Sequence, residues 1–276
     1  MTFKLAVFGN PIAHSLSPQI HEQFAAQAGI DVAYEKVLVE SEQFKPVAQD
    51  FFDAGGKGLN ITVPHKLLAY DLAQQCSDEA NAAEAVNTLF KTKDGELRGE
   101  NTDGWGLLKD IETNLKWQVK NQRVLLLGAG GAAQGVIANL LEKQPALLVI
   151  ANRTYERAAT LVERFNDPRF VACDIVELSD LEPFDLIISA SSGGLDKDNQ
   201  ESFLPANLRQ SATCCYDMIY GKQTPFLAWA ETLPKTQRSD GLGMLVEQAA
   251  RSFELWFDVK VETRQVLTNL RETRVS

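Results

Sequence analysis

The strongest constraint on the fold lies between residues 123 and 157. An apolar run at 124–127 is followed by the turn GAGGAA at 128–133, and a second apolar run covers 147–151. A strand, a glycine turn of spacing G-x-G-x-x-A, a helix and a second strand are typical of a dinucleotide-binding fold. The first glycine permits the tight turn, and the second lets the backbone approach a pyrophosphate. The N–H groups that begin the helix would then face the phosphates.

The residues after the second apolar run indicate which dinucleotide binds. NAD-binding folds place Asp or Glu here, where the carboxylate accepts from the ribose 2′-hydroxyl. This chain has Asn152 and Arg153, with Arg157 four residues on, and no acid before Glu156. Guanidinium groups pair with a phosphate, whereas a carboxylate repels one. The cluster therefore predicts NADP. The alternative is an α/β domain without a nucleotide, in which both arginines are ordinary surface residues.

Composition and charge narrow the classes of partner. The 276 residues are enough for about two domains. The 27 basic and 37 acidic residues give a net charge of −10, which argues against general binding to nucleic acid or anionic membranes. No apolar stretch approaches the ~20 residues of a membrane span, and the N-terminus lacks a signal-peptide pattern. We expect a cytoplasmic enzyme that acts on a small molecule, as a monomer or a homodimer.

Cysteine and histidine spacing predicts reduced thiols and no metal site. The cysteines have neither metal-ligand nor C-x-x-C spacing, and the histidines are scattered along the chain. These residues are Cys76, Cys173, Cys214, Cys215, His14, His21 and His65.

The first part of the chain reads as alternating strands and helices. Strands are predicted at 3–9, 34–39 and 59–63, and helices at 18–29, at 44–54 and from 64 onward. This alternation favours a mainly parallel sheet. Ser17 is predicted as the N-cap of the first helix, with Pro18 in its first turn. Segments 85–89 and 99–104 flank a hairpin-like turn at 93–95.

The second part begins near residue 104 with a linking helix and continues with the nucleotide fold. Its later strands are predicted at 170–173, 184–189 and 213–219. Two helices are predicted at 242–257 and 261–272. The predicted fold class is thus α/β with two domains.

Polar residues of the first part gather where ligands bind in open α/β sheets, beyond the carboxyl ends of the strands. They are Ser15, Ser17, Asn60, Thr62, Lys66, Asn87 and Asp103. Hydroxyls, amides, one cation and one carboxylate suit a small polyhydroxylated acid. Each residue alone also has a common structural explanation, such as a helix cap or a solvated lysine. Their shared location carries the interpretation.

The same residues carry a resemblance to a known family. In chain order, the segments GNP–HSLSP, NITVPHK, AVNT, NTDG, GAGGAA, NRT, YDMIY and DGLGMLVEQA are similar to those of NADP-dependent shikimate dehydrogenase. The match runs from residue 5 to about 257. The resemblance implies an oxidoreductase that reversibly reduces 3-dehydroshikimate to shikimate with NADPH, in aromatic amino-acid biosynthesis. One departure is His65, which stands where many members carry an aromatic residue.

The resemblance also implies three regions. They are a substrate-binding catalytic domain at 1–103, a Rossmann-like NADP domain at 104–240, and C-terminal helices at 241–276 that pack back on the substrate domain.

The resemblance assigns substrate contacts residue by residue. Ser15 and Ser17 would hold the shikimate carboxylate, with Tyr220 assisting. Asn60, Thr62, Asn87 and Gln248 would bind around the hydroxyls. Lys66 and Asp103 would be the catalytic pair beside the reacting carbonyl, with Asp103 also contacting the substrate.

Cofactor contacts follow in the same way. The pyrophosphate would lie on Gly128, Ala129, Gly130, Gly131 and Ala132. The adenosine 2′-phosphate would be recognised by Asn152, Arg153, Thr154 and Arg157. Met218 and Gly241 would line the nicotinamide side, and Asp78 would contact the cofactor.

Two alternatives stay open at this point. A quinate/shikimate dehydrogenase using NAD or NADP would be expected to carry an acidic residue near the adenosine ribose. A catalytically silent NADP-binding regulator would keep the glycine turn and lose Lys66 or Asp103. Both of these residues are present.

Overall fold

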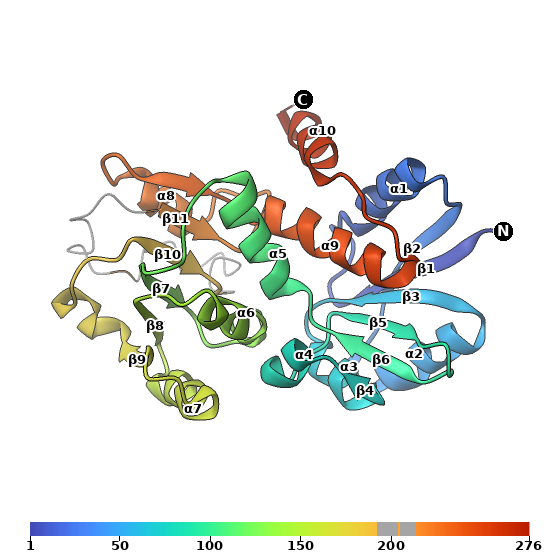
Figure 1. The fold of residues 1–276 in the computed structure, drawn as a ribbon, viewed down its shortest axis with the longest axis horizontal. Coiled ribbons are helices and arrows are strands. Elements are labelled where there is room, and N and C mark those ends of the chain that lie inside the picture. Colours follow the sequence, from blue (N-terminus) through green and yellow to red (C-terminus); the bar gives the residue numbers. More distant parts are fainter. Residues whose placement is uncertain (192–203, 205–213, 276) are drawn as a thin grey trace. The chain divides into compact units, whose positions relative to one another are not determined.

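The computed structural model describes residues 1–191, 204 and 214–275. The chain divides into two compact units, Met1–Gly106 with Leu245–Ser276, and Leu107–Met244. Each unit contains a six-stranded sheet with helices around it (Figure 1). Both divisions fall inside helices, α5 (Asp103–Lys109) and α9 (Leu242–Phe257). The predicted class, a two-domain α/β fold with mainly parallel sheets, is confirmed.

The first unit has the strand order β2-β1-β3-β5-β6-β4. Its strands are β1 (Phe3–Gly9), β2 (Val32–Leu38), β3 (Gly56–Ile61), β4 (Gln75–Cys76), β5 (Thr88–Lys91) and β6 (Leu97–Glu100). Its other elements are α1 (Ser17–Ala28), the 3₁₀ turn η1 (Ser41–Gln43), α2 (Phe44–Asp53), α3 (Lys66–Leu72), α4 (Asp78–Ala83) and α10 (Thr263–Val275). β1 pairs in parallel with β2 and β3, whereas β5 runs antiparallel to β3.

This antiparallel strand decides where Asn87 lies. Asn60 pairs with Thr88 across β3 and β5. Because β5 runs against β3, its first residues lie at the carboxyl end of β3. Asn87, directly before β5, therefore reaches the edge of the sheet to which β3 brings Asn60.

The second unit has the strand order β12-β11-β10-β7-β8-β9, and all its pairings are parallel. Its strands are β7 (Arg123–Leu127), β8 (Leu147–Asn152), β9 (Phe170–Asp174), β10 (Leu186–Ser189), β11 (Cys214–Asp217) and β12 (Gln237–Ser239). Its other elements are the π-helical η2 (Asp110–Asn114), α6 (Gly131–Glu142), α7 (Tyr155–Phe165), the 3₁₀ turn η3 (Ile175–Asp180) and α8 (Pro225–Glu231). Read from the β9 edge, and with β7 to β12 counted as strands 1 to 6, the order is 3-2-1-4-5-6. This is the strand order of dinucleotide-binding folds.

Alternating residues of the central strands enter two separate cores. Val124 and Leu126 of β7 pack with residues of α5, α6 and α7. Leu125 and Leu127 pack on the other face, with η3 and α8. Because side chains alternate along a strand and both faces are covered, β7 is apolar throughout. This explains the uninterrupted apolar run in the sequence.

One predicted cap is wrong. The first hydrogen bond of α1 runs from the Ile20 N–H to the Leu16 carbonyl, so Leu16 is the N-cap and Ser17 is the first helical residue. The Ser17 N–H instead donates to the Ser15 hydroxyl at 3.3 Å. The chain therefore turns into the helix one residue earlier than the proline spacing predicts.

Other differences are small. β4 and α4 were not predicted, because elements of two and six residues carry little periodicity. The strand predicted at 213–219 is β11, with residue 213 outside the described residues. No helix in the part of the chain that the structure describes is long and apolar enough to cross a membrane. All four cysteines are free thiols.

Candidate active site and cofactor site

Lys66 and Asp103 form an ion pair in the first unit. The Lys66 Nζ lies 2.5 Å from the Asp103 Oδ2, and the two side chains are 19% and 8% exposed. Lys66 opens α3, and its carbonyl accepts from the Val86 N–H at 2.9 Å. Asp103 opens α5, and its N–H donates to the Asn101 Oδ1 at 3.1 Å. The structure thus brings together the two residues predicted as the catalytic pair.

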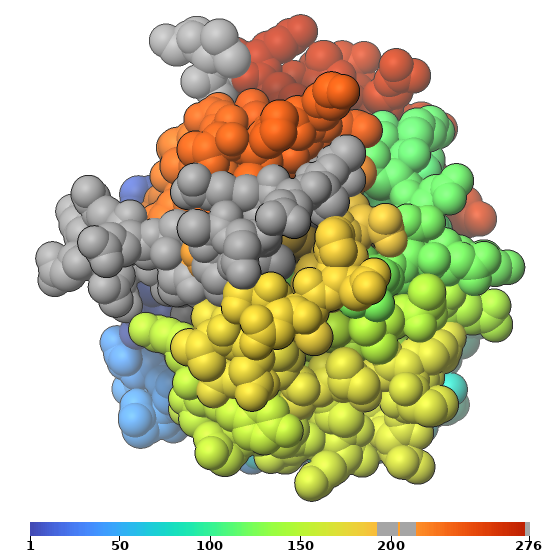
Figure 2. Space-filling view, turned by 90° about the vertical axis from the view of Figure 1, so that its left-hand side faces the viewer, coloured from blue at the N-terminus to red at the C-terminus, as the bar shows by residue number. Residues whose placement is uncertain are grey.

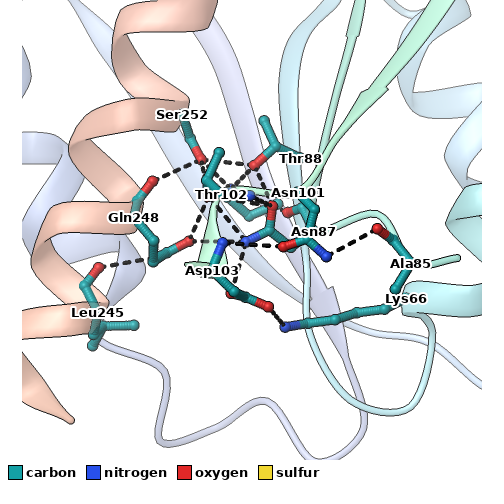
Figure 3. Close-up of polar contacts among 11 residues, drawn as sticks. Lys66, Ala85, Asn87, Thr88, Asn101, Thr102, Asp103, Leu245, Gln248 and Ser252 are labelled. Atoms are coloured by element: carbon teal, nitrogen blue, oxygen red, sulfur yellow. Dashed lines mark hydrogen bonds and ion pairs between the residues drawn. The ribbon is translucent and has the colours of Figure 1, made fainter. Parts of the chain in front are cut away.

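Asn87 links this pair to neighbouring side chains (Figure 3). Its Nδ2 donates to the Asp103 Oδ1 at 2.8 Å and to the Gln248 Oε1 at 3.4 Å. Its Oδ1 accepts from the Thr102 N–H at 2.9 Å. Since a backbone N–H can only donate, this contact fixes which end of the amide faces Asp103.

The resulting assembly is a group of polar side chains drawn from α3, β5, α5, α9 and the loops between them. We call it the polar cluster; it consists of Lys66, Asn87, Thr88, Asn101, Thr102, Asp103, Gln248 and Ser252. Gln248 and Ser252 come from α9, more than 140 residues later in the chain than Asp103. Both of them lie in the first unit, with the rest of the cluster.

Asn60 lies next to the polar cluster. It is 5% exposed, and its Oδ1 accepts from the Tyr34 hydroxyl at 2.7 Å. Its Nδ2 donates to the Ser252 Oγ at 3.1 Å and the Thr88 Oγ1 at 3.2 Å. Burial raises the pKa of Tyr34, with a smaller opposing effect of the Ser17 side chain. Tyr34 therefore stays a neutral donor to Asn60.

Ser15 and Ser17 lie together before and at the start of α1. Their hydroxyls are 3.1 Å apart, with Ser15 donating to Ser17. Thr62 follows β3, and its N–H donates to the Phe8 carbonyl of β1 at 2.9 Å. A Cβ on Gly9 would lie 2.4 Å from the Thr62 Cγ2, so the glycine lets these two segments approach closely. All the predicted substrate contacts except Tyr220 lie in the first unit.

The aromatic surroundings of Tyr34 include a buried histidine. The His21 ring stacks on Tyr34 at 4.8 Å and on Trp256 at 5.1 Å between centroids. Neither ring nitrogen has a hydrogen-bond partner among the described residues. Burial lowers the pKa of His21 to about 3, with a smaller opposing effect of the nearby Asn60 side chain. His21 is therefore a neutral part of the core.

The glycines of the turn in the second unit differ in why glycine is needed. Gly128 has a backbone conformation that favours glycine, whereas Gly130 and Gly131 do not. Gly128 has a φ of +104°, and a Cβ there would meet backbone atoms of Ala190 and Ser191 at 3.2 Å. Gly130 is the N-cap of α6 and has a φ of −91°, so no side chain caps the first N–H groups of this helix. A Cβ on Gly130 or Gly131 would meet nothing within 4 Å among the described residues. Neither conformation nor crowding by these residues requires glycine at 130 and 131, which leaves space over the start of α6 for a phosphate-bearing ligand.

The basic cluster follows β8 on the surface of the second unit. The Asn152 Nδ2 donates to the Thr154 carbonyl at 2.9 Å, which closes the turn into α7. Arg153, Thr154 and Arg157 are exposed, and neither guanidinium forms an ion pair within the described residues. Figure 2 shows the stretch from α7 through η3, yellow-green to yellow, on this face. Two exposed cations, one directly after β8 and one in the first turn of α7, are suited to a phosphate.

The remaining predicted contacts are divided between the units. Met218 and Gly241 touch, because a Cβ on Gly241 would lie 2.3 Å from the Met218 carbonyl oxygen. Tyr220, half-buried, lies two residues beyond Met218 in the second unit. Asp78 lies in the first turn of α4 in the first unit, where an acid also interacts favourably with the helix dipole. It lines a cavity of about 520 Å³ with Arg98, Glu100 and Arg251.

Sequence reasoning missed Tyr34, Thr88, Thr102 and Ser252 as members of the site. Ser252 had a detectable signal, because it follows Gln248 by one helical turn on a helix predicted to be mainly apolar. Tyr34 had none, since a tyrosine in a half-buried strand is common.

Comparisons with known proteins agree with this geometry. Three family models match in chain order: shikimate dehydrogenase substrate binding domain at 7–89, shikimate / quinate 5-dehydrogenase at 110–212, and shikimate 5'-dehydrogenase C-terminal domain at 241–270. The NADP(+) shikimate dehydrogenase of Cellvibrio japonicus is 47% identical over 272 residues, which are 98% of each chain. The chain belongs to the shikimate dehydrogenase family. This confirms the resemblance found in the sequence.

Solved structures of similar proteins have the same fold. An Ael1 enzyme from Pseudomonas putida is 40% identical, with a TM-score of 0.90 over 97% of this chain and 98% of that one. The shikimate 5-dehydrogenase of Thermus thermophilus, in complex with NADP(H) and shikimate, is 30% identical. Its TM-score is 0.87, over 98% of this chain and 99% of that one.

His65, which departs from the pattern that the family resemblance implies, packs as an aromatic residue would. The buried ring stacks on Phe44 at 5.1 Å between centroids, as an aromatic side chain would. Its Nε2 lies 2.8 Å from the Val39 carbonyl, which can only accept, so Nε2 carries the proton. The ring thus packs beside Lys66 and forms one hydrogen bond, while its buried Nδ1 has no partner among the described residues.

Proposed function

We propose that this chain catalyses the reversible NADP-dependent oxidation of shikimate to 3-dehydroshikimate. The observation that carries the proposal is the Lys66–Asp103 pair, held inside the polar cluster of a chain that belongs to the shikimate dehydrogenase family. The glycine turn and the exposed arginines after β8 support NADP as the cofactor.

Lys66 moves the proton in this mechanism. During reduction the Lys66 ammonium gives a proton to the forming alkoxide, and during oxidation the neutral amine accepts the hydroxyl proton. Such acid–base assistance is worth about 10²–10⁴-fold in rate. Asp103 holds the Lys66 Nζ in place through its Oδ2 and is itself held by Asn87 through its Oδ1. The bound nicotinamide would exchange the hydride with the substrate carbon.

Substrate binding divides between the reacting end and the carboxylate end. Asn60, Thr62, Asn87, Asp103 and Gln248 surround the hydroxyls. Ser15 and Ser17 bind the carboxylate with their adjacent hydroxyls, and Tyr220 assists. The support for this assignment is that every one of these residues except Tyr220 belongs to the same compact unit as Lys66.

All the residues proposed to bind the cofactor, except Asp78, belong to the second unit. Gly128, Ala129, Gly130, Gly131 and Ala132 hold the pyrophosphate at the start of α6, where N–H groups point outward. Asn152, Arg153, Thr154 and Arg157 bind the adenosine 2′-phosphate. Met218 and Gly241 line the nicotinamide side, and Asp78 contacts the cofactor.

A rate matrix tests the function. The enzyme is assayed at 340 nm with shikimate or quinate and with NADP or NAD. We expect kcat/KM for shikimate with NADP to exceed that for shikimate with NAD by at least about tenfold, since a phosphate–guanidinium bond contributes about 1.5–3 kcal/mol. Equal rates with quinate and NAD would favour the quinate/shikimate alternative. NADP binding without turnover of either substrate would make the chain a silent regulator.

Cellular setting and assembly are part of the same proposal. We place the enzyme in the cytoplasm, as a monomer or a homodimer that binds no nucleic acid. Four free thiols support a reducing compartment, and the net charge of −10 opposes contact with polyanions.

A further inference from the structure

The amide of Asn60 is hydrogen-bonded at both ends inside the first unit. Its oxygen accepts from Tyr34 of β2 at 2.7 Å, and its nitrogen donates to Thr88 of β5 and Ser252 of α9. These contacts join three elements to β3 at one point. A buried polar network whose members are all partnered rigidifies the surrounding structure.

Thr88 and Ser252 connect Asn60 to the residues around the catalytic pair. Both residues are fully buried, and their hydroxyl oxygens lie 2.7 Å apart. The Thr88 hydroxyl donates to the Asn87 Oδ1 at 3.0 Å. The Ser252 Oγ also lies 3.1 Å from the Gln248 carbonyl, one turn earlier in α9, so its single proton is shared between this carbonyl and the Thr88 Oγ1. Each hydroxyl therefore contacts a residue that touches the catalytic pair or its neighbours.

The hydrogen bonds have a defined direction along this path. The Asn60 Nδ2 also lies 3.4 Å from the Asn87 carbonyl, which can only accept, so the nitrogen end of Asn60 faces Thr88. The Thr88 oxygen thus accepts from Asn60, and its single proton is left for the acceptors beside it, Asn87 Oδ1 and Ser252 Oγ. These hydrogen bonds keep the Asn87 Oδ1 facing Thr88 and the Asn87 Nδ2 facing the Asp103 carboxylate.

We propose that Thr88 and Ser252, supported by Tyr34 through Asn60, are positioning residues for the reaction. They hold Asn87 and Gln248 so that Asp103 and Lys66 keep their geometry while the substrate reacts. This inference rests on the proposed function. The hydroxyls of Thr88, Ser252 and Tyr34 need not touch the substrate. Each acts through the side-chain amide of a residue proposed to bind it, and these residues are Asn87, Gln248 and Asn60.

The competing explanation is a purely structural role. In that case the hydroxyls only satisfy buried groups, and their loss lowers the free energy of unfolding without changing the chemistry of the folded enzyme. A positioning role predicts a loss of turnover in fully folded protein, because small misplacements of a reacting group are costly in rate.

The chain offers a rescue variant and a matched control. Thr88→Val removes the hydroxyl at nearly constant volume, and Thr88→Ser restores it. Thr92, in the same β5–β6 hairpin, has a buried hydroxyl with no partner among the described residues. Thr92→Val therefore removes a buried hydroxyl that lies outside the path.

The experiment measures kcat and both KM values with shikimate and NADP, well below the melting temperature of each variant. We expect Thr88→Val to lower kcat/KM for shikimate by about tenfold to a hundredfold, mostly in kcat, with KM for NADP within about twofold of wild type. Thr88→Ser should recover to within about threefold of wild type, and Thr92→Val should equal it. Ser252→Ala should lose about fivefold to tenfold, and it carries the test if Thr88→Val fails to fold.

Several results would overturn the proposal. A folded Thr88→Val enzyme with wild-type kcat would leave the hydroxyls a structural role only. So would a Thr88→Ser enzyme as slow as Thr88→Val, or a loss confined to KM for shikimate. A wild-type enzyme that does not oxidise shikimate would instead overturn the proposed function itself, so the two failures are distinguishable.

Discussion

The glycine turn of the second unit and the polar cluster of the first differ in what makes each a site. The turn offers backbone N–H groups, and two of its glycines face open space. The polar cluster consists of side chains that already satisfy one another. In the turn, a ligand would use backbone N–H groups at the start of α6, whereas the Gly128 N–H already donates to the Ala151 carbonyl at 2.8 Å. In the polar cluster, a ligand would join a hydrogen-bond network that exists without it. The geometry of the polar cluster therefore depends on residues that the ligand never touches.

Lys66→Ala should have the largest effect and tests the polar cluster directly. We expect kcat and kcat/KM to fall at least ~10²-fold, because an acid–base group is lost, with NADP affinity nearly unchanged. Steady-state rates and NADP titration measure both. Lys91→Ala is the matched control, since Lys91 forms only an exposed pair with Asp53 at 3.2 Å. A Lys66→Ala enzyme that keeps more than about a tenth of kcat would contradict the role.

A change in the basic cluster should come next in size. The double variant Asn152→Asp with Arg153→Ser should lower kcat/KM with NADP by about tenfold to a hundredfold, because one guanidinium is lost and a repelling carboxylate is gained. The value with NAD should hold or rise, since its 2′-hydroxyl can donate to the new carboxylate. Initial rates with both cofactors decide. Equal losses would mean that these residues support the fold and do not bind the phosphate.

Two glycine variants sharpen the contrast within the turn. Gly130→Ala should lower stability by less than about 1 kcal/mol, because alanine is a poorer N-cap than glycine but φ is −91° and no described residue crowds the position. It should raise KM for NADP about tenfold by blocking close approach of the phosphates. Gly128→Ala should lower stability by about 1–2 kcal/mol, because its φ is +104°. Melting curves and NADP titration of both variants measure the difference. A Gly130→Ala protein that melts early and binds NADP normally would reverse the assignment.

Ser15→Ala and Ser17→Ala should have the smallest effects. We expect KM for shikimate to rise about fivefold with little change in kcat, since the carboxylate changes little during hydride transfer. Because Leu16 is the N-cap of α1, Ser17→Ala should cost no helix cap and shift stability by less than about 0.5 kcal/mol. A melting curve and KM on one preparation test both. A fall in stability with unchanged KM would make Ser17 structural.

The same contrast explains what could be predicted from the sequence. The turn and its flanking strands are local, so spacing alone predicted β7, the start of α6 and β8. The polar cluster joins residues up to 164 positions apart, as in the Thr88–Ser252 contact. Lys66, Asn87 and Asp103 were predicted from their places at strand ends and Gln248 from the family resemblance, and no local pattern could have paired Thr88 with Ser252.

Boundaries were less predictable than elements. The chain passes between its units inside α5 and α9. A continuous helix gives no break in periodicity, so the sequence could not place the divisions at 106 and 244. The N-cap of α1 was misplaced for a related reason, because the proline is compatible with either of its first two positions.

The polar cluster also has a consequence for how the first unit assembles. Asn60 and Thr88 meet because β3 and β5 pair in one register. If β5 slipped by one residue, Thr88 would turn to the opposite face of the sheet, and the Asn60 amide would lose a partner in the interior. An unpaired buried group costs about 1–3 kcal/mol. The residues that hold the catalytic pair thereby also favour the correct strand register during folding. A sheet paired in the wrong register would be destabilised by the unpaired amide, whereas an all-apolar core would lack this destabilisation.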